Sequence, residues 1–217
     1  MNAFVLAGGQ STRMGHDKAL LVVDRRTLVE HMLEKLPRPG LQARICGSRP
    51  DLARFAEVVP DNFAQSGPLG GIEAALAASD SEFNLFVPVD LPGLPPEFLQ
   101  WLVARAERSH AVATIPRFGD RLQPLCAVYS SQLLDGVRES LVAGRRKVMD
   151  AIEKSARGLG QQIDSFDVEC VAATGPEAWP QKPHPAAWFR NINTPADHEA
   201  LQASSSHTGA KARYPIS

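Results

Sequence analysis

The chain has 217 residues, of which 44% are hydrophobic, a length and composition typical of one α/β domain with a substantial core. Its 23 lysines and arginines nearly balance 24 aspartates and glutamates, so neither nucleic acid nor an anionic membrane is expected as a partner. The apolar runs are far shorter than the roughly 18 residues of a membrane span, and no basic region precedes the first of them. We therefore expect a cytoplasmic protein in which the widely spaced Cys46, Cys126 and Cys170 are buried thiols, not disulfides or zinc ligands.

Apolar runs separated by turn residues predict strands that alternate with helices. In chain order, the first part is expected to hold a strand at 3–6, a glycine-rich loop at 8–18, a strand at 20–23, a helix at 28–36 capped by Thr27, a strand at 43–46, a helical turn at 50–55, a strand at 58–59, a helix at 71–78 and a strand at 83–89. The second part is expected to hold a helix at 95–107, strands at 111–115 and 123–129, helices at 130–142 and 148–152, a strand at 162–168 and a short helix at 196–201.

This order predicts a three-layer, Rossmann-like α/β fold with a mainly parallel central sheet and helices on both faces. The nearly continuous apolar run 83–89 is typical of a strand that is buried on both faces. Residues 1–202 are predicted to form one domain, and the low hydrophobicity of 203–217 predicts a disordered tail. In such folds ligands bind beyond the carboxyl ends of the strands, where the sequence has the first loop, Asp61 and Asp90.

The loop after the first strand has the composition of an anion-binding site. The segment LAGGQSTRMGHDKAL, at 6–20, combines glycines with two cationic side chains, Arg13 and Lys18. Glycines let the backbone approach a ligand closely, and successive N–H groups can hold phosphate. Neither the ending of a Walker A loop nor the GxGxxG spacing of a dinucleotide fingerprint is present. The loop indicates a nucleoside triphosphate site, with a tight turn that carries solvated charges as the alternative.

Two carboxylates follow predicted strands at the same edge. Asp90 ends a buried strand, so its charge needs a partner, and Mg²⁺ that carries triphosphate oxygens is one candidate. A helix cap or a turn-forming aspartate is the alternative. Asp61 could contact the metal, the nucleotide or a second substrate, or be a plain loop carboxylate. Residues 66–71 place backbone donors at a helix start, where they could hold a phosphate or a polar base edge, or form a turn without a ligand.

Together these blocks resemble a known family. The segment 6–20 resembles the signature LAGGxSxRMGxDK of nucleotidyltransferases with a glycosyltransferase-A-like (nucleotide-diphospho-sugar transferase-like) fold. Within this superfamily the likeness is greatest to the molybdenum cofactor guanylyltransferases of the MobA type. The later blocks that carry it are PLGGI at 68–72, PVDLP at 88–92, QPLCAVY at 123–129 and FRNINTPADHEAL at 189–201. The signature matches at every fixed position, namely Leu6, Ala7, Gly8, Gly9, Ser11, Arg13, Met14, Gly15, Asp17 and Lys18.

The resemblance implies a reaction of GTP with molybdopterin, or with its molybdenum form, that yields the guanine dinucleotide cofactor and pyrophosphate with the help of Mg²⁺. It implies that Lys18, Arg13 and Asp90 are catalytic, that Asp90 binds the metal, and that Asn191 and Asn193 lie on the pterin side. The implied nucleotide contacts are Leu6, Ala7, Gly8, Gly9, Lys18, Ser48, Asp61, Pro68, Leu69, Gly70 and Asp90. Other proteins of molybdenum cofactor biosynthesis and apo-molybdoenzymes are implied as further partners.

Two other functions are compatible with the same residues. A molybdopterin cytidylyltransferase, or a sugar- or polyol-phosphate nucleotidyltransferase, shares the opening loop, although the GPLGG segment at 67–71 favours guanine. A nucleotide-binding module without catalysis is the other alternative, and the presence of both Lys18 and Asp90 argues against it. Turnover with GTP or with CTP distinguishes the guanylyltransferase from the cytidylyltransferase. The activity of a Lys18→Ala variant tests the nucleotide-binding module without catalysis.

Overall fold

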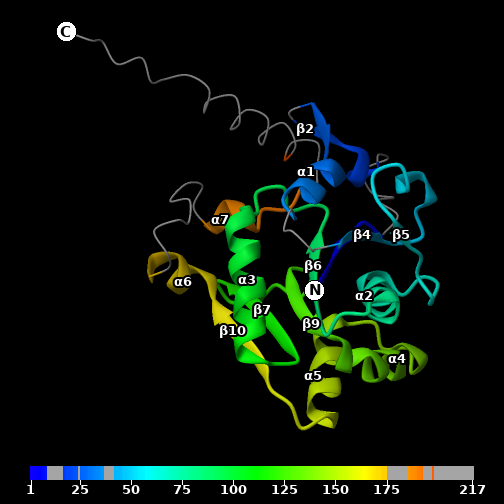
Figure 1. Cartoon of the computed structure of the whole chain (residues 1–217), viewed down its shortest axis with the longest axis vertical. Coiled ribbons are helices and arrows are strands. Elements are labelled where there is room, and N and C mark those ends of the chain that lie inside the picture. Colours follow the sequence, from blue (N-terminus) through cyan, green and yellow to red (C-terminus); the bar gives the residue numbers. More distant parts are fainter. Residues whose placement is uncertain (9–16, 24, 37–41, 175–184, 193–196, 198–217) are drawn as a thin grey trace.

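A mixed, mainly parallel sheet forms the centre of the computed structural model, which describes residues 1–8, 17–23, 25–36, 42–174, 185–192 and 197 (Figure 1). Its strands within these ranges are β1 (Asn2–Leu6), β4 (Gln42–Cys46), β5 (Val58–Val59), β6 (Phe83–Pro88), β7 (Ala113–Phe118), β8 (Arg121–Leu122), β9 (Ala127–Ser130) and β10 (Ile163–Asp167). The order across the sheet is β10-β7-β9-β6-β1-β4-β5, with β8 paired to β7. β9 runs antiparallel to both of its neighbours, whereas β1 is parallel to β4 and β6. A separate ribbon pairs β2 (Val22–Val23) with β3 (Arg26–Thr27).

Helices cover both faces of the sheet, and their buried side chains form two hydrophobic clusters. The helices on one face are α1 (Leu28–Glu34), α3 (Pro96–Ser109), α6 (Val168–Thr174) and α7 (Pro185–Trp188), and those on the other are α2 (Gly67–Ala78), α4 (Leu134–Val142) and α5 (Val148–Gly158). Successive strand side chains point to opposite faces, so β1 supplies Ala3 and Val5 to the first cluster and Phe4 and Leu6 to the second. In Figure 1, α2, α4 and α5 gather at the lower right, and α1 lies near the top.

Local sequence explains where several elements begin and end. The Thr27 hydroxyl accepts a hydrogen bond from the Glu30 N–H, and the Glu30 carboxylate accepts one from the Thr27 N–H, which together form a capping box at the start of α1. All six residues of β6 are buried, because the strand lies between β1 and β9 with a helix layer on each side. The mainly parallel sheet with helices on both faces confirms the predicted fold class.

The structure corrects several element boundaries. α2 begins at Gly67 instead of 71, because Pro68 is favourable in a first helical turn and Leu69 is already buried. α5 continues to Gly158, six residues beyond the predicted end at Ile152, since Ser155 and Ala156 extend its buried stripe. Two predicted strands are shorter than expected. The strand predicted at 20–23 contains only β2, which follows the 3₁₀ helix η1 (Lys18–Leu20). The strand predicted at 123–129 is β9, which begins at Ala127.

Other predictions concern single residues and the carboxyl-terminal part of the chain. Cys46 and Cys126 are buried thiols as expected, but Cys170 is exposed, since it lies on the short helix α6 at the margin of the fold. The predicted helix at 196–201, apart from Asp197, and the tail at 203–217 lie outside the described residues. Among the helices that the structure describes, none combines the length and the apolar character needed to cross a bilayer.

Candidate active site

Lys18 and Asp90 meet at the carboxyl ends of two neighbouring parallel strands. Lys18 is the first residue of η1, and Asp90 follows β6 by two residues. The Lys18 Nζ lies 3.4 Å from Asp90 Oδ2, and both side chains keep about a fifth of their surface exposed, 22% and 19%. The Val89 N–H donates to the Leu6 carbonyl oxygen at 3.1 Å, which fixes the turn that carries Asp90 against the end of β1. The chain thus brings a cation and a carboxylate, 72 residues apart, to the edge where ligands of such sheets bind.

The backbones that leave β1 and β4 touch through two glycines. A Cβ atom on Gly47 would lie 2.9 Å from both Cα and N of Gly8, and Gly47 has a φ of +136° that other residues rarely adopt. The Ala7 N–H donates to the Cys46 carbonyl oxygen at 3.0 Å, which extends the β1–β4 pairing to this point. Steric and torsional demands therefore both require glycine at position 47. Ser48, a predicted nucleotide contact, follows directly at this edge.

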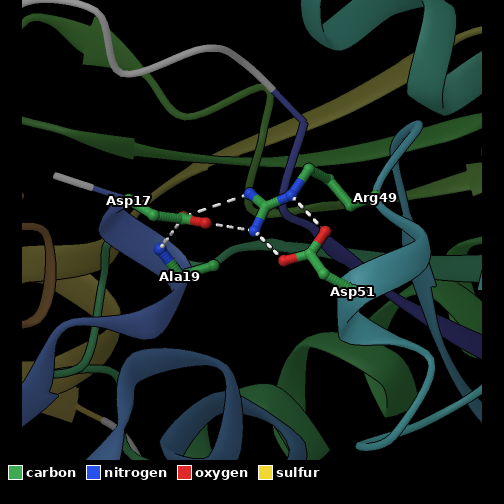
Figure 2. A network of polar contacts seen from close by, with 4 residues as sticks. All are labelled: Asp17, Ala19, Arg49 and Asp51. Atoms are coloured by element: carbon green, nitrogen blue, oxygen red, sulfur yellow. Dashed lines mark hydrogen bonds and ion pairs between the residues drawn. The ribbon is translucent and has the colours of Figure 1, made fainter. Parts of the chain in front are cut away.

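Arg49 joins the segment before Lys18 to the segment after β4 (Figure 2). Its Nη1 donates to Asp17 Oδ1 at 3.1 Å and its Nη2 donates to Asp17 Oδ2, while Nε donates to Asp51 Oδ1 at 2.9 Å. The hydrogen bond from Arg49 is the main cause that lowers the pKa of the Asp51 carboxyl, and the carboxylates in turn raise the pKa of the Arg49 guanidinium. Sequence reasoning did not single out Arg49. Its place directly after Ser48 and the presence of Asp17 in the signature were the available signals.

Asp61 lies after β5 and faces the start of α2. Its Oδ1 atom is buried and accepts no hydrogen bond from the residues that the structure describes, and burial raises the pKa of this carboxyl. A Cβ atom on Gly71 would lie 3.6 Å from the same Oδ1 atom. Pro68, Leu69 and Gly70 occupy the first turn of α2 and have no polar side chain, so they can offer a ligand only backbone groups. An unpaired buried carboxylate oxygen is costly and suits a ligand that donates hydrogen bonds.

The segment 185–192 packs against the turn that carries Asp90. The Ile192 N–H donates to the Asp90 carbonyl oxygen at 3.1 Å, and a Cβ atom on Gly93 would lie 2.2 Å from the Ala187 carbonyl oxygen. Asn191 is exposed next to this contact. Three predicted site residues, Gly9, Arg13 and Asn193, lie outside the described residues.

Within the described residues, the structure places most of the predicted site at one edge of the sheet. Leu6 ends β1 and Ala7 and Gly8 follow it, while Ser48, Asp61 and Asp90 follow β4, β5 and β6 in turn. Among the described residues, no group of three or more histidine, cysteine, aspartate or glutamate side chains could hold a metal ion.

The sheet is Rossmann-like, and glycine contacts and a lysine–carboxylate pair lie beyond the ends of its parallel strands. This arrangement defines an α/β protein of the nucleotide-binding class. The family model described as "MobA-like NTP transferase domain" matches residues 3–158, and the chain belongs to this family.

Two relatives and one solved structure share nearly the whole chain. A molybdenum cofactor guanylyltransferase from Xanthomonas euvesicatoria is 37% identical over 91% of this chain and 92% of its own length. A probable molybdenum cofactor guanylyltransferase from Pelotomaculum thermopropionicum is 34% identical over 94% of each chain. The crystal structure of molybdopterin-guanine dinucleotide biosynthesis protein A from Archaeoglobus fulgidus aligns with a TM-score of 0.73 at 25% identity, covering 95% of this chain and 100% of that one. The resemblance stated from the motifs is thus confirmed.

Proposed function

We propose that this protein transfers GMP from GTP to molybdopterin, or to its molybdenum form, and releases pyrophosphate. The observation that carries the proposal is the 3.4 Å pair of Lys18 and Asp90 beyond the ends of β1 and β6. The names of the relatives, which are 34% and 37% identical over almost the full chain, support GTP as the nucleotide. In this reaction an oxygen of the terminal pterin phosphate forms a bond to the α-phosphorus of GTP, and the bond from that phosphorus to the pyrophosphate oxygen breaks.

The residues around the first strand would bind the triphosphate. Lys18 neutralises the charge that grows on the leaving pyrophosphate, and Arg13 assists it from the same loop. Backbone groups of 6–9 would approach the nucleotide, because glycine has no side chain to keep a ligand away from the backbone. Ser48, two residues after β4, would contribute a further polar contact.

The turn after β5 and the first turn of α2 would read the base. The buried Asp61 Oδ1, which lacks a donor among the described residues, supports a ligand that presents N–H groups at this point. Residues 68–70 add only backbone groups from the start of α2. Guanine has N–H donors on its polar edge and cytosine has a smaller set, so this arrangement supports GTP over CTP.

The donor set is compatible with Mg²⁺. Asp90 is one carboxylate at the phosphate edge, and Mg²⁺ characteristically combines one or two carboxylates with phosphate oxygens and water. Asp90 would hold the ion, which when bound offsets charge on the triphosphate and orients the leaving group. The nucleophile needs no general base from the chain, since a phosphate monoester is largely ionised near pH 7.

The pterin is proposed to lie on the side of Asp90 where residues 185–192 pack. The hydrogen bond from the Ile192 N–H to the Asp90 carbonyl oxygen supports this, because it brings Asn191 close to the reaction edge. Asn193 is proposed to act from the same block. The dinucleotide product would then pass to other proteins of molybdenum cofactor biosynthesis or to apo-molybdoenzymes in the cytoplasm.

Pyrophosphate release tests the proposal directly. The protein is incubated with Mg²⁺, molybdopterin and one nucleoside triphosphate at a time, and pyrophosphate and the dinucleotide product are measured. We expect turnover with GTP that depends on molybdopterin. Turnover with CTP and not with GTP would overturn the guanylyltransferase assignment. GTP binding without turnover would indicate the non-catalytic module.

A further inference from the structure

The Arg49 guanidinium is almost fully used by carboxylates of this chain. Besides its two bonds to Asp17 and the bond from Nε to Asp51, Nη2 donates to Asp51 Oδ2 at 2.6 Å. These four bonds use four of the five N–H groups that a guanidinium carries. Figure 2 shows the guanidinium lying between the two carboxylates. Arg49 therefore has little capacity left to bind a phosphate itself.

Asp17 connects this network to Lys18. Its Oδ1 atom also accepts a hydrogen bond from the Ala19 N–H at 3.0 Å, which caps the start of η1. Lys18 is the first residue of η1, directly after Asp17, and extends to within 3.4 Å of Asp90. The position of the Asp17 carboxylate thus fixes the start of η1 and, with it, the position of the Lys18 backbone.

Arg49 in turn is anchored to the sheet. The Gly47 N–H donates to the Val59 carbonyl oxygen at 3.1 Å, and the Arg49 N–H donates to the Gly47 carbonyl oxygen at 2.8 Å. Asp51, in the 3₁₀ helix η2 (Pro50–Leu52), holds the other edge of the guanidinium. A planar guanidinium with paired bonds to carboxylates has a defined orientation, which a lysine ammonium cannot reproduce.

We infer that Arg49 is a positioning residue, which holds Asp17 against the end of β4 and thereby places Lys18 for the triphosphate. This inference rests on the proposed function, because Lys18 acts there on the leaving pyrophosphate. Arg49 also neutralises the negative charge of Asp17, so that this carboxylate does not repel the phosphates. Direct binding of phosphate by Arg49 is the competing explanation, and the experiment distinguishes the two.

Two substitutions break the pair from opposite sides. Arg49→Lys keeps the positive charge and removes the paired geometry, whereas Asp17→Asn keeps an oxygen that can cap η1 and removes the carboxylate. We expect each to lower kcat with GTP by about 10- to 100-fold, as for other residues that orient a reacting group. Arg26→Lys is the matched control, because Arg26 pairs with Glu34 at an exposed position on α1 and β3. We expect this control to retain kcat, and urea midpoints show which variants remain folded.

A double-substitution cycle with Lys18→Ala separates positioning from direct binding. If Arg49 acts through Lys18, Arg49→Lys should change kcat by no more than about two-fold in the Lys18→Ala background. Full multiplication of the two effects, or a higher KM for GTP with unchanged kcat, would show direct contact with the nucleotide and overturn the inference. Unchanged kinetics in both Arg49→Lys and Asp17→Asn would do the same.

Calorimetric titration with GTP and Mg²⁺ repeats the cycle without turnover. We expect the loss of affinity in Arg49→Lys to disappear when Lys18 is already alanine. Equal losses in both backgrounds would contradict the inference. A wild-type chain that binds GTP but releases no pyrophosphate would overturn the proposed function alone, since the binding cycle still decides the role of Arg49.

Discussion

The Glu73 carboxylate and the Arg138 guanidinium join α2 to α4 beside the loop that carries Asp61. The Arg138 Nε donates to Glu73 Oε1 at 2.6 Å, and the Asn62 side-chain amide donates to Glu73 Oε2 at 3.0 Å. The Glu73 side chain is fully buried, whereas that of Arg138 is 43% exposed. A charge buried in this way is stable only while both of its oxygens have partners. Glu73 therefore holds Asn62, the neighbour of Asp61, against α2.

Arg138→Met should destabilise the fold, because it leaves the buried Glu73 carboxylate with Asn62 as its remaining described partner. We expect a loss of about 1–3 kcal/mol in the free energy of unfolding, measured by urea denaturation. Glu73→Gln in the same background should recover part of the loss, since the amide carries no charge. Lys154→Met, in the exposed pair with Glu139 between α4 and α5, is the control and should change stability by at most about 1 kcal/mol. Equal losses in both variants would contradict a special role for the buried pair.

Lys18→Ala should lower kcat with GTP by about 10²-fold or more, as when one donor to developing charge is removed. Lysine at this position faces Asp90 across 3.4 Å, so the alanine variant also leaves Asp90 without this cation. Pyrophosphate release at saturating GTP measures the effect, with Lys154→Ala as a surface control. Normal turnover by Lys18→Ala would remove Lys18 from the mechanism.

Asp90→Asn should raise the Mg²⁺ concentration that half-maximal activity requires, because an amide oxygen is a weaker ligand for Mg²⁺ than a carboxylate. A titration of activity with Mg²⁺ at fixed GTP measures the shift. Asp150→Asn, at an exposed position on α5, provides the matched control. The proposed metal contact of Asp90 is wrong if the titration curve of Asp90→Asn superimposes on that of the wild type.

Asp61→Asn should stabilise the protein without nucleotide at neutral pH. Burial raises the pKa of Asp61, so the folded chain binds its proton more tightly than the unfolded chain does. Stability is therefore lost as pH rises from the ordinary aspartate pKa, about 3.9, through the raised value. We expect a higher Tm for Asp61→Asn at pH 7 and little change below about pH 4. A lower Tm at pH 7 would show that the Asp61 carboxylate has a stabilising partner.

Asp51→Asn should change the Tm at pH 7 in the opposite direction to Asp61→Asn. Arg49 lowers the pKa of Asp51, so its contribution to stability is present above the ordinary aspartate pKa and is lost as pH falls. We expect Asp51→Asn to lower the Tm at pH 7, where the ion pair is intact, and to converge with the wild type in acid. Thermal unfolding between about pH 3.5 and pH 8 measures both variants, a range chosen around the ordinary pKa.

Element type followed from local pattern, whereas element length depended on neighbours. Thr27 and Glu30 lie three residues apart, so the capping box that starts α1 depends only on nearby sequence. The end of α5 was wrong by six residues because Ser155 and Ala156 look like ordinary surface residues until α4 covers them. β9 began later than predicted, because its pairing with β6 and β7 includes no residue before Ala127.

The sequence by itself determined the alternation of strands and helices and the residues that can carry chemistry at the strand ends, notably Lys18 and Asp90. Both properties depend on residues close together in the chain. Only the tertiary structure decided which charged groups pair. Asp17 and Arg49 are 32 residues apart, and they meet because β1 and β4 are neighbours in the sheet. The partner of a guanidinium depends on this strand order, which sets distances in space that sequence spacing does not contain.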